Sequence, residues 1–225
     1  MENPLLRNAP SCGSPYSNLI PRLSLHVLVD PEWSRGRDIL TIASAAIEGG
    51  ATVIQLRDKK ASTRLLVEQG LALRQLTRER GILFIVNDRV DVALAVDADG
   101  VHIGQDDMPL HMARQLLGPQ RILGISVGNL DEAHAAVATH ADYLSVGPIF
   151  LTYAKPDAGP AIGTHLLTEL ATRYQTPIIG IGGITAENAG QTIQAGATGV
   201  AVITAVISAE DVCSATHKLS VVIKR

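Results

Sequence analysis

Residues 82–107 read ILFIVNDRVDVALAVDADGVHIGQDD, and this stretch shows the repeating unit of the fold. It contains two short apolar runs, ILFIV at 82–86 and GVHIG at 100–104, and between them a pattern that predicts a short helix beginning near Val90. A strand, a helix and a second strand in close succession are typical of parallel sheets, in which helices connect the strands. The stretch therefore predicts one βα unit and the start of the next.

The same alternation continues along the chain from Ser24 onward. A longer helix is predicted over residues 62–80, for example, because its leucines recur at the spacing of one helix face. Eight such units favour a closed (β/α)8 TIM barrel over an open doubly wound sheet, because open sheets usually have fewer strands and no GxGxxG motif follows the first strand. We therefore expect a single α/β barrel domain over residues 23–225. The predicted strands are 24–31, 52–57, 82–86, 100–104, 121–126, 143–147, 177–182 and 199–203.

The first 22 residues differ in composition from the rest of the chain. They include Pro4, Pro10, Pro15 and Pro21 together with several serines and asparagines, so they offer little apolar surface to offset the entropy lost on ordering. Residues 1–22 are therefore predicted to form a flexible N-terminal tail.

The composition excludes several classes of protein. A net charge of -3 with scattered basic residues provides no positive surface for nucleic acid, so no nucleic-acid partner is expected. No apolar run reaches the roughly 18 residues of a membrane span and no signal-peptide pattern is present, so we expect no membrane association and a cytoplasmic location. Cys12 and Cys213 are too few for a disulfide framework or a zinc quartet. A homo-oligomer is compatible with these totals.

Polar side chains gather where the predicted strands end, which is where the active sites of (β/α)8 barrels lie. Gln55, Arg57 and Lys59 end the second strand at a spacing of two, which places all three on one face. Carboxylates among several cations are typical of a site for a Mg²⁺–pyrophosphate complex, because Mg²⁺ takes one or two protein carboxylates together with phosphate oxygens. The other strand-end residues are Asn87, Asp88, Asp106, Asp107, Ser126, Thr152, Lys155, Gly182, Gly183, Ile203 and Thr204.

The acidic residues of residues 82–107 are not equivalent. Asp91, Asp97 and Asp99 lie in the predicted helix or in the turn before the next strand, where a solvated or turn-forming role is expected. Asp88 has two interpretations, since it could cap the helix that follows it or belong to the site. Its position at the end of a strand favours the site.

Glycines follow the seventh predicted strand. Gly182 and Gly183, ahead of a helix expected to begin at Thr185, would leave backbone N–H groups and the positive end of the helix dipole available to a phosphate. A structural turn explains the GIGG motif at 180–183 equally well, but its position is that of the usual phosphate site of these barrels.

The seven histidines show no spacing typical of a zinc site. His102 lies within the fourth predicted strand and is expected to be a hydrogen-bonded core residue, while His134, His140 and His217 are expected on helix surfaces. None of them enters the predicted site.

Seven motifs occur in order at the predicted strand ends: QLRDK (55–59), FIVND (84–88), DGVHIGQDD (99–107), GISVGN (124–129), GPIFLTYAKPDAGPAIG (147–163), IGIGGIT (179–185) and GVAVITAV (199–206). Together they resemble the thiamine phosphate synthase family, which also contains thiazole tautomerases. The resemblance extends from Ser24 to the C-terminus. It implies a (β/α)8 barrel that joins a hydroxymethylpyrimidine diphosphate to a thiazole phosphate with Mg²⁺ as cofactor, so that its partners are small-molecule substrates.

The resemblance also implies a role for each strand-end residue. Asp88 and Asp107, rather than the adjacent Asp106, are similar to the Mg²⁺ ligands of the family. The catalytic residues, which would stabilise the leaving pyrophosphate, are Arg57, Lys59, Ser126 and Lys155. The pyrimidine diphosphate site would comprise these four with Gln55 and Asn87, and the thiazole phosphate site would comprise Thr152, Gly183, Ile203 and Thr204.

The chain departs from the family pattern after the sixth predicted strand. The family usually has Thr-x-Thr-Lys there, whereas this chain has Thr-Tyr-Ala-Lys at 152–155, so Ala154 lacks a hydroxyl that would contact the thiazole phosphate. One alternative is a thiazole tautomerase-type isomerase, although that branch usually carries a histidine where this chain has Gly128. A second is a non-catalytic paralogue that binds thiamine precursors, which the complete set of predicted leaving-group residues disfavours.

Overall fold

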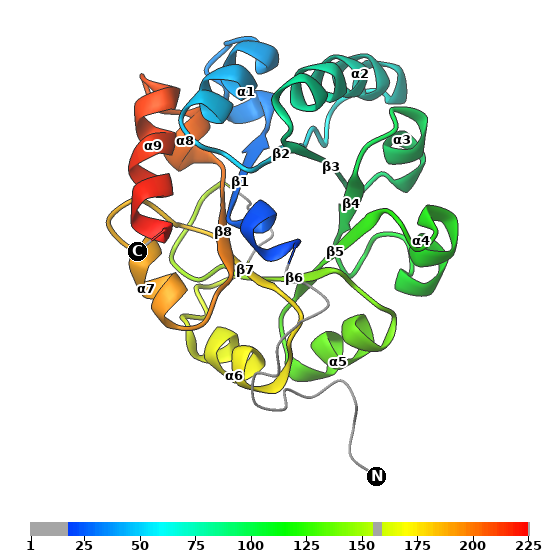
Figure 1. Cartoon of the computed structure of the whole chain (residues 1–225), viewed down its shortest axis with the longest axis vertical. Helices are drawn as coiled ribbons and strands as arrows, with labels where there is room; N and C mark the ends of the chain where they lie inside the picture. Colours follow the sequence, from blue (N-terminus) through cyan, green and yellow to red (C-terminus); the bar gives the residue numbers. More distant parts are fainter. Residues whose placement is uncertain (1–17, 155–158, 225) are drawn as a thin grey trace.

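The computed structural model describes residues 18–154 and 159–224, which form a closed barrel of eight parallel strands surrounded by helices (Figure 1). The strands follow one another around the ring in chain order, and β8 closes the ring by pairing with β1. The predicted (β/α)8 barrel is thereby confirmed. The strands are β1 Leu25–Val29, β2 Val53–Leu56, β3 Leu83–Asn87, β4 Gly100–Ile103, β5 Ile122–Val127, β6 Tyr143–Val146, β7 Ile178–Ile181 and β8 Gly199–Val202.

Helices connect the strands and form the outer ring. Ser62 caps the long second helix by accepting a hydrogen bond from the N–H of Leu65 at 3.3 Å. No helix within the described residues is long and apolar enough to cross a membrane. The α-helices are α1 Ile39–Glu48, α2 Thr63–Arg80, α3 Val90–Ala95, α4 Leu110–Leu117, α5 Leu130–Ala138, α6 His165–Arg173, α7 Ala189–Gln194, α8 Thr204–Ile207 and α9 Val212–Ile223, and the 3-10 helices are η1 Ile20–Leu23 and η2 Pro31–Trp33.

Each strand has one face toward the helices and one toward the barrel interior. Outward side chains such as Val27, Ile54 and Val101 are fully buried in the main apolar cluster, which the helices share. A second apolar cluster fills the interior near the starts of the strands. It consists of Leu23, Leu28, Val53, Leu83, Ile85, Tyr143, Ile179 and Ala201.

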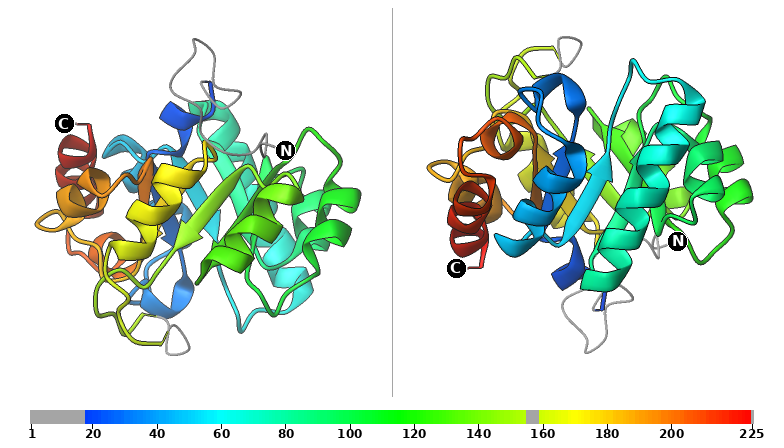
Figure 2. Two further views of the ribbon diagram at one scale, coloured as in Figure 1. Left: turned by 90° about the horizontal axis from the view of Figure 1, so that it is seen from below. Right: turned by 90° about the horizontal axis from the view of Figure 1, so that it is seen from above.

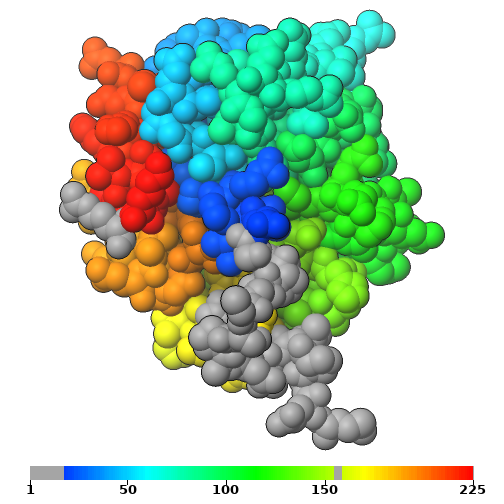
Figure 3. All heavy atoms as spheres, in the orientation of Figure 1, coloured from blue at the N-terminus to red at the C-terminus, as the bar shows by residue number. Residues whose placement is uncertain are grey.

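The short helix η1 closes the N-terminal end of the barrel. It lies in the centre of the strand ring in Figure 1 and at one end of the barrel in both views of Figure 2. In Figure 3 the blue segment at the start of the described chain fills the middle of this face. Leu23 is fully buried in the interior cluster, and Leu19 packs against the same cluster. The structure therefore differs from the predicted tail of residues 1–22, because residues 18–22 cover the interior; the predicted flexibility of residues 1–17 lies outside the described residues.

Side chains at this end of the barrel accept hydrogen bonds from N–H groups of the first or second residues of the strands. Asp99, directly before β4, accepts a hydrogen bond from the N–H of Phe84 at 2.8 Å, and Arg74 of α2 donates to the same oxygen at 2.9 Å. The residues before β2, β6 and β8 likewise accept a hydrogen bond from an N–H group of the strand that precedes each of them in the chain. These pairs are Thr52 with Leu25 at 2.9 Å, Asp142 with Leu123 at 2.8 Å and Thr198 with Ile178 at 3.1 Å.

Candidate active site

The C-terminal ends of the strands surround a cavity of about 830 Å³. Every strand or the loop that follows it contributes to the wall, and the deepest part reaches His26, Tyr143 and Ile179 inside the barrel. The cavity brings together all the predicted site residues within the described part of the chain. They are Gln55, Arg57, Lys59, Asn87, Asp88, Asp107, Ser126, Thr152, Gly183, Ile203 and Thr204.

Two buried polar side chains at the end of β2 face this cavity, as their spacing predicts. Arg57 forms an ion pair with Asp30, the residue after β1, and both side chains are buried. A guanidinium has five N–H donors, so the pair with Asp30 orients Arg57 and leaves donors for a ligand. The Oε1 atom of Gln55 is buried without a hydrogen-bond partner among the described residues. The end of β2 therefore presents both donors and an acceptor to a bound molecule.

Two carboxylates lie together beside a lysine at the ends of β3 and β4. Lys59 Nζ is 3.6 Å from Asp88 Oδ2, and Asp107 Oδ2 accepts a hydrogen bond from the N–H of Gly104 at 2.6 Å. Burial, followed by the negative charge of Asp107, raises the pKa of Asp88 to about 6. Paired carboxylate oxygens of this kind suit a hard cation such as Mg²⁺.

The described residues contain no cluster of three or more histidine, cysteine or acidic side chains that could hold a metal ion. A cation at Asp88 and Asp107 would therefore draw its other oxygen ligands from substrate and water, as Mg²⁺ commonly does. Asp106 also borders the cavity, but it is exposed.

Asp88 does not cap the helix that follows it. The N-cap position of α3 belongs to Arg89, and no side chain caps the helix. Asp88 has a left-handed backbone with φ of 63°, and its N–H donates to the carbonyl oxygen of His102 at 2.7 Å. Such a conformation is uncommon outside glycine and clusters at functional sites, which favours the site interpretation of Asp88.

A hydrogen-bonded chain crosses the interior beneath the acids. His102 Nε2 lies 3.0 Å from Ser126 Oγ, and His102 Nδ1 lies 3.0 Å from the hydroxyl of Tyr143. The hydrogen bonding expected for His102 is confirmed. The sequence analysis left His102 out of the predicted site, but His102 lines the cavity and contacts Ser126.

The segment after β7 differs from the one predicted to bind phosphate. Helix α7 begins at Ala189 rather than at Thr185, and the N–H of Thr185 donates to Asn188 Oδ1 at 2.8 Å. The side chain of Asn188 thus competes with helix formation and occupies the N–H group that was expected to bind phosphate. Gly183 still borders the cavity, with φ of 63°, and a Cβ there would lie 2.4 Å from the carbonyl oxygen of Leu151.

The end of β8 offers a second set of backbone donors. Ile203 is the N-cap of α8, which begins at Thr204, and both residues line the cavity. The first N–H groups of a helix lack acceptors within the helix. These groups lie across the strand ring from the acids of β3 and β4 (Figure 1). The cavity thus has an acidic and cationic side and, opposite it, a side of glycine and backbone N–H groups.

Comparison with known proteins places this barrel in a family. The profile of the family described as thiamine monophosphate synthase matches residues 25–206. The chain belongs to this family. It is 51% identical over 206 residues to the thiamine-phosphate synthase of Moorella thermoacetica, covering 92% of this chain and 98% of that protein. It is 54% identical over 195 residues to the thiamine-phosphate synthase of Chloroflexus aurantiacus, covering 87% and 90%.

A solved structure supports the same membership in the thiamine monophosphate synthase family. The thiamine phosphate pyrophosphorylase from Pyrococcus furiosus superimposes with a TM-score of 0.85 at 44% identity, covering 92% of this chain and 98% of that one. A 3-hexulose-6-phosphate synthase superimposes with a TM-score of 0.64 at 16% identity, a likeness that shows the fold alone.

The segment in which this chain departs from the family pattern lies at the cavity rim. Thr152 borders the cavity, and its Oγ1 accepts a hydrogen bond from the N–H of Ala154 at 3.2 Å. Ala154 is buried and also borders the cavity. Lys155 lies outside the described residues, so its predicted role stays a prediction.

Besides His102, sequence reasoning missed three residues that line the cavity or pair with its wall. Asp30 directly follows the first predicted strand, and His26 alternates with apolar residues inside it, so strand position and a spacing of two were available signals. Burial lowers the pKa of His26 to about 3, and its Nε2 has no partner among the described residues. Tyr143 left no such signal, because a tyrosine at the start of a strand is usually a core residue.

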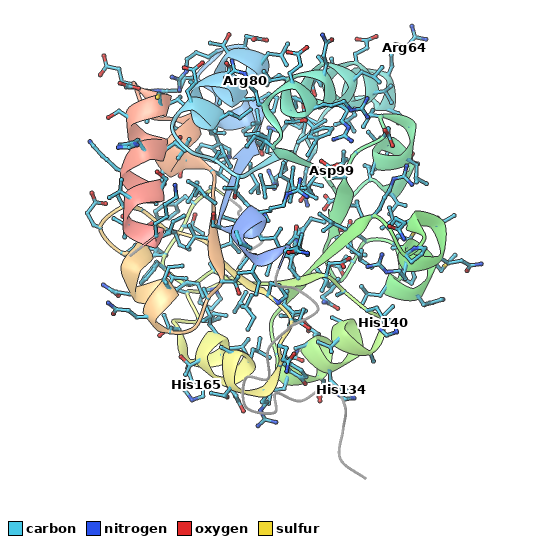
Figure 4. All side chains as sticks on the ribbon, in the orientation of Figure 1. Arg64, Arg80, Asp99, His134, His140 and His165 are labelled. Carbon is cyan, nitrogen blue, oxygen red and sulfur yellow. The ribbon has the colours of Figure 1, made fainter. Side chains whose placement is uncertain are left out.

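The acids that were expected in turns lie away from the cavity, as predicted, and pair with arginines. Figure 4 labels Asp99, whose partners are described above, and it places His134, His140 and His165 at the periphery of the helix ring. The other two of these acids form ion pairs as well: Asp91 with Arg89 at 2.6 Å, and Asp97 with Arg78 at 2.8 Å and with Arg121 at 3.0 Å.

Proposed function

We propose that this chain is a transferase that condenses 4-amino-2-methyl-5-hydroxymethylpyrimidine diphosphate with a thiazole phosphate, forming thiamine phosphate and pyrophosphate. Membership of the thiamine monophosphate synthase family carries this proposal. The two unlike sides of the cavity support it, because the reaction needs room for one diphosphate and one phosphate at the same time.

The acidic and cationic side is proposed to bind the pyrimidine diphosphate. Arg57, Lys59 and Lys155 supply positive charge, and Ser126 supplies a hydroxyl. Gln55 and Asn87 suit the heterocycle, because amide groups can both donate and accept hydrogen bonds. The buried and unpaired Oε1 of Gln55 is consistent with a ligand that donates to it.

Asp88 and Asp107 are proposed to hold Mg²⁺. Their proximity, which contributes to the raised pKa of Asp88, would be relieved by a divalent cation between them. The ion would neutralise part of the charge on the diphosphate when bound. The chain itself holds the two carboxylates in place through the Gly104 N–H bond to Asp107 and the left-handed backbone of Asp88.

The opposite side is proposed to bind the thiazole phosphate. Thr152 offers a hydroxyl, while Gly183, Ile203 and Thr204 offer backbone N–H groups. Phosphate groups bind well where a glycine turn and the first turn of a helix meet.

The chemistry is proposed to be dissociative. Departure of pyrophosphate from the electron-rich pyrimidine leaves a stabilised cation, which the thiazole nitrogen then attacks. No general base is needed at that nitrogen, so the residues of the site mainly stabilise the leaving group and align the two rings.

One assay tests the proposal against its alternatives. Purified chain is mixed with both phosphorylated precursors, with Mg²⁺ or with a chelator, and thiamine phosphate is measured. The transferase forms thiamine phosphate only with the metal. Absence of the product under both conditions would contradict the transferase and leave an isomerase or a binding paralogue. The cytoplasmic location and the homo-oligomer stay predictions.

A further inference from the structure

We infer that Tyr143 and His102 are positioning residues that turn the hydroxyl proton of Ser126 into the cavity, where it donates to the diphosphate. The inference rests on the proposed function, because the contact between Ser126 and the diphosphate belongs to that proposal. Tyr143 and His102 themselves would act through Ser126.

The contact between His102 and Tyr143 depends on a glycine that lies between them. His102 of β4 and Tyr143 of β6 are not on neighbouring strands, and Gly124 of β5 lies in register between them. A Cβ on Gly124 would lie 2.0 Å from Cζ of Tyr143. Glycine therefore lets the tyrosine cross β5 and place its ring against His102, with ring centroids 5.5 Å apart and planes at 19°.

Burial decides which way the proton of the tyrosine points. Tyr143 is 1% exposed, and burial, followed by the charge of Asp142, holds the pKa of Tyr143 above its ordinary value, so the phenol keeps its proton. Its hydroxyl lies 3.0 Å from His102 Nδ1. If the phenol instead accepted a hydrogen bond from Nδ1–H, its own buried proton would lose Nδ1 as an acceptor, which is unfavourable for a buried donor. Tyr143 therefore donates to Nδ1.

The tautomer of His102 follows from this donation. A neutral imidazole whose Nδ1 accepts carries its proton on Nε2. Nε2–H then donates to Ser126 Oγ, 3.0 Å away. The hydroxyl proton of Ser126 cannot also point at His102, so it turns to the cavity that both residues line.

The opposite tautomer of His102 would reverse the hydrogen bond between His102 and Ser126. Ser126 would then donate to Nε2 and present only lone pairs to the cavity. Phosphate oxygens accept hydrogen bonds, and charge grows on them as the leaving group departs, so a hydroxyl that donates stabilises the transition state more than the bound substrate. The hydrogen-bonded chain thus selects the productive orientation.

Steady-state kinetics of Tyr143→Phe test this role. The variant removes only the hydroxyl, and we expect kcat to fall about tenfold while KM for the pyrimidine diphosphate stays within about twofold, the size expected for a lost hydrogen bond that acts in the transition state. Tyr174→Phe is the matched control, because Tyr174 is buried and lies outside the cavity wall. An unchanged kcat for Tyr143→Phe would overturn the inference.

A double variant separates positioning from a structural role. In a Ser126→Ala background the orientation of the hydroxyl no longer matters, so adding Tyr143→Phe should lower kcat no further. A further fall of about tenfold would show independent action and overturn the inference.

The tautomer itself is observable without any turnover. Long-range ¹H–¹⁵N spectra of the substrate-free wild-type chain, assigned with His102→Gln, should show His102 protonated at Nε2 and unprotonated at Nδ1. A proton on Nδ1 would overturn the inference even if Tyr143→Phe did not fold. Failure of the wild-type chain to make thiamine phosphate would instead contradict the proposed function and leave the assigned tautomer standing.

Discussion

Aspartate side chains have opposite environments at the two ends of the barrel. At the N-terminal end, Asp142 accepts hydrogen bonds from the N–H of Leu123 and from Arg114, so its charge has protein partners. At the C-terminal end, Asp88 and Asp107 lie against each other beside one lysine and border a cavity. Asp142 thus completes the fold at one end, whereas Asp88 and Asp107 at the other end repel each other.

This difference teaches where stability and function separate in the molecule. An acid that is paired in the folded state stabilises it, whereas an acid whose pKa is raised by burial and a like charge destabilises it. The C-terminal end therefore costs folding free energy, which the N-terminal end and the apolar clusters offset.

The largest effect is expected from the acids of the C-terminal end. Asp88→Ala or Asp107→Ala should lower kcat/KM by about a thousandfold or more, because the proposed Mg²⁺ would lose a ligand and the charge of the diphosphate would stay unneutralised. The melting temperature should not fall for Asp88→Ala, because the pKa of Asp88 is raised by burial and by the charge of Asp107. The exposed Asp106 supplies the control, and a damaging Asp106→Ala with a harmless Asp107→Ala would reverse the metal assignment.

Lys155 tests the cationic part of the same end. Lys155→Ala should lower kcat by about a hundredfold, roughly 2.7 kcal/mol at 1.36 kcal/mol per decade, with a smaller change in KM for the pyrimidine diphosphate. Single-turnover rates exclude slow product release as the cause. Lys60→Ala is the matched control, since Lys60 pairs with Glu32 outside the cavity wall. A change in KM alone would assign Lys155 to simple binding.

The N-terminal end should respond in stability and not in turnover. Asp142→Ala leaves the N–H of Leu123 and the guanidinium of Arg114 unpaired, so urea unfolding should show a loss of about 2 kcal/mol while kcat is unchanged. Asp91→Ala, which removes an exposed pair with Arg89, should cost less than about 1 kcal/mol. A fall in kcat for a folded Asp142→Ala would break the separation between the two ends.

The raised pKa of Asp88 should make the stability of the folded chain depend on pH. The folded-state pKa of Asp88 is raised from 3.8 to about 6, so the folded chain binds more protons than the unfolded chain across this window. Stability from this group therefore falls as pH rises through that window. Without divalent cations, Asp88→Asn should stabilise the chain by roughly 1 kcal/mol at pH 7.5, after allowance for solvent screening, and by little at pH 4. Equal effects at both pH values would contradict the raised pKa.

The smallest effect is expected at the rim of the cavity. Ala154→Thr adds the hydroxyl that the family usually has, and a neutral hydrogen bond contributes about 0.5–1.5 kcal/mol, so KM for the thiazole phosphate should fall several-fold. KM for the pyrimidine diphosphate should not change. A loss of activity would indicate that the loop around the buried Ala154 is arranged differently from that of its relatives.

The fold was predictable because its signals are local. Each strand is a short apolar run, each helix has a periodic apolar face, and eight repeats of the pair leave a closed barrel as the favoured arrangement. The position of Arg57 on the cavity wall was predictable for the same reason, because side chains two residues apart in a strand share a face. Strand-end position likewise identified Asp88, Ser126 and Thr204 as cavity residues.

Local patterns in the sequence thus encode the barrel and the end that carries its cavity. The pairing of the polar groups, by contrast, is set by tertiary contacts. Asp99 and Asp107 both flank β4, yet one meets an N–H of β3 and an arginine of α2 while the other meets Asp88. His102 and Tyr143 become partners only because β5 places Gly124 between them. Hydrogen bonds between residues far apart in the chain depend on distances that register and closure of the barrel set, and no local pattern encodes those distances.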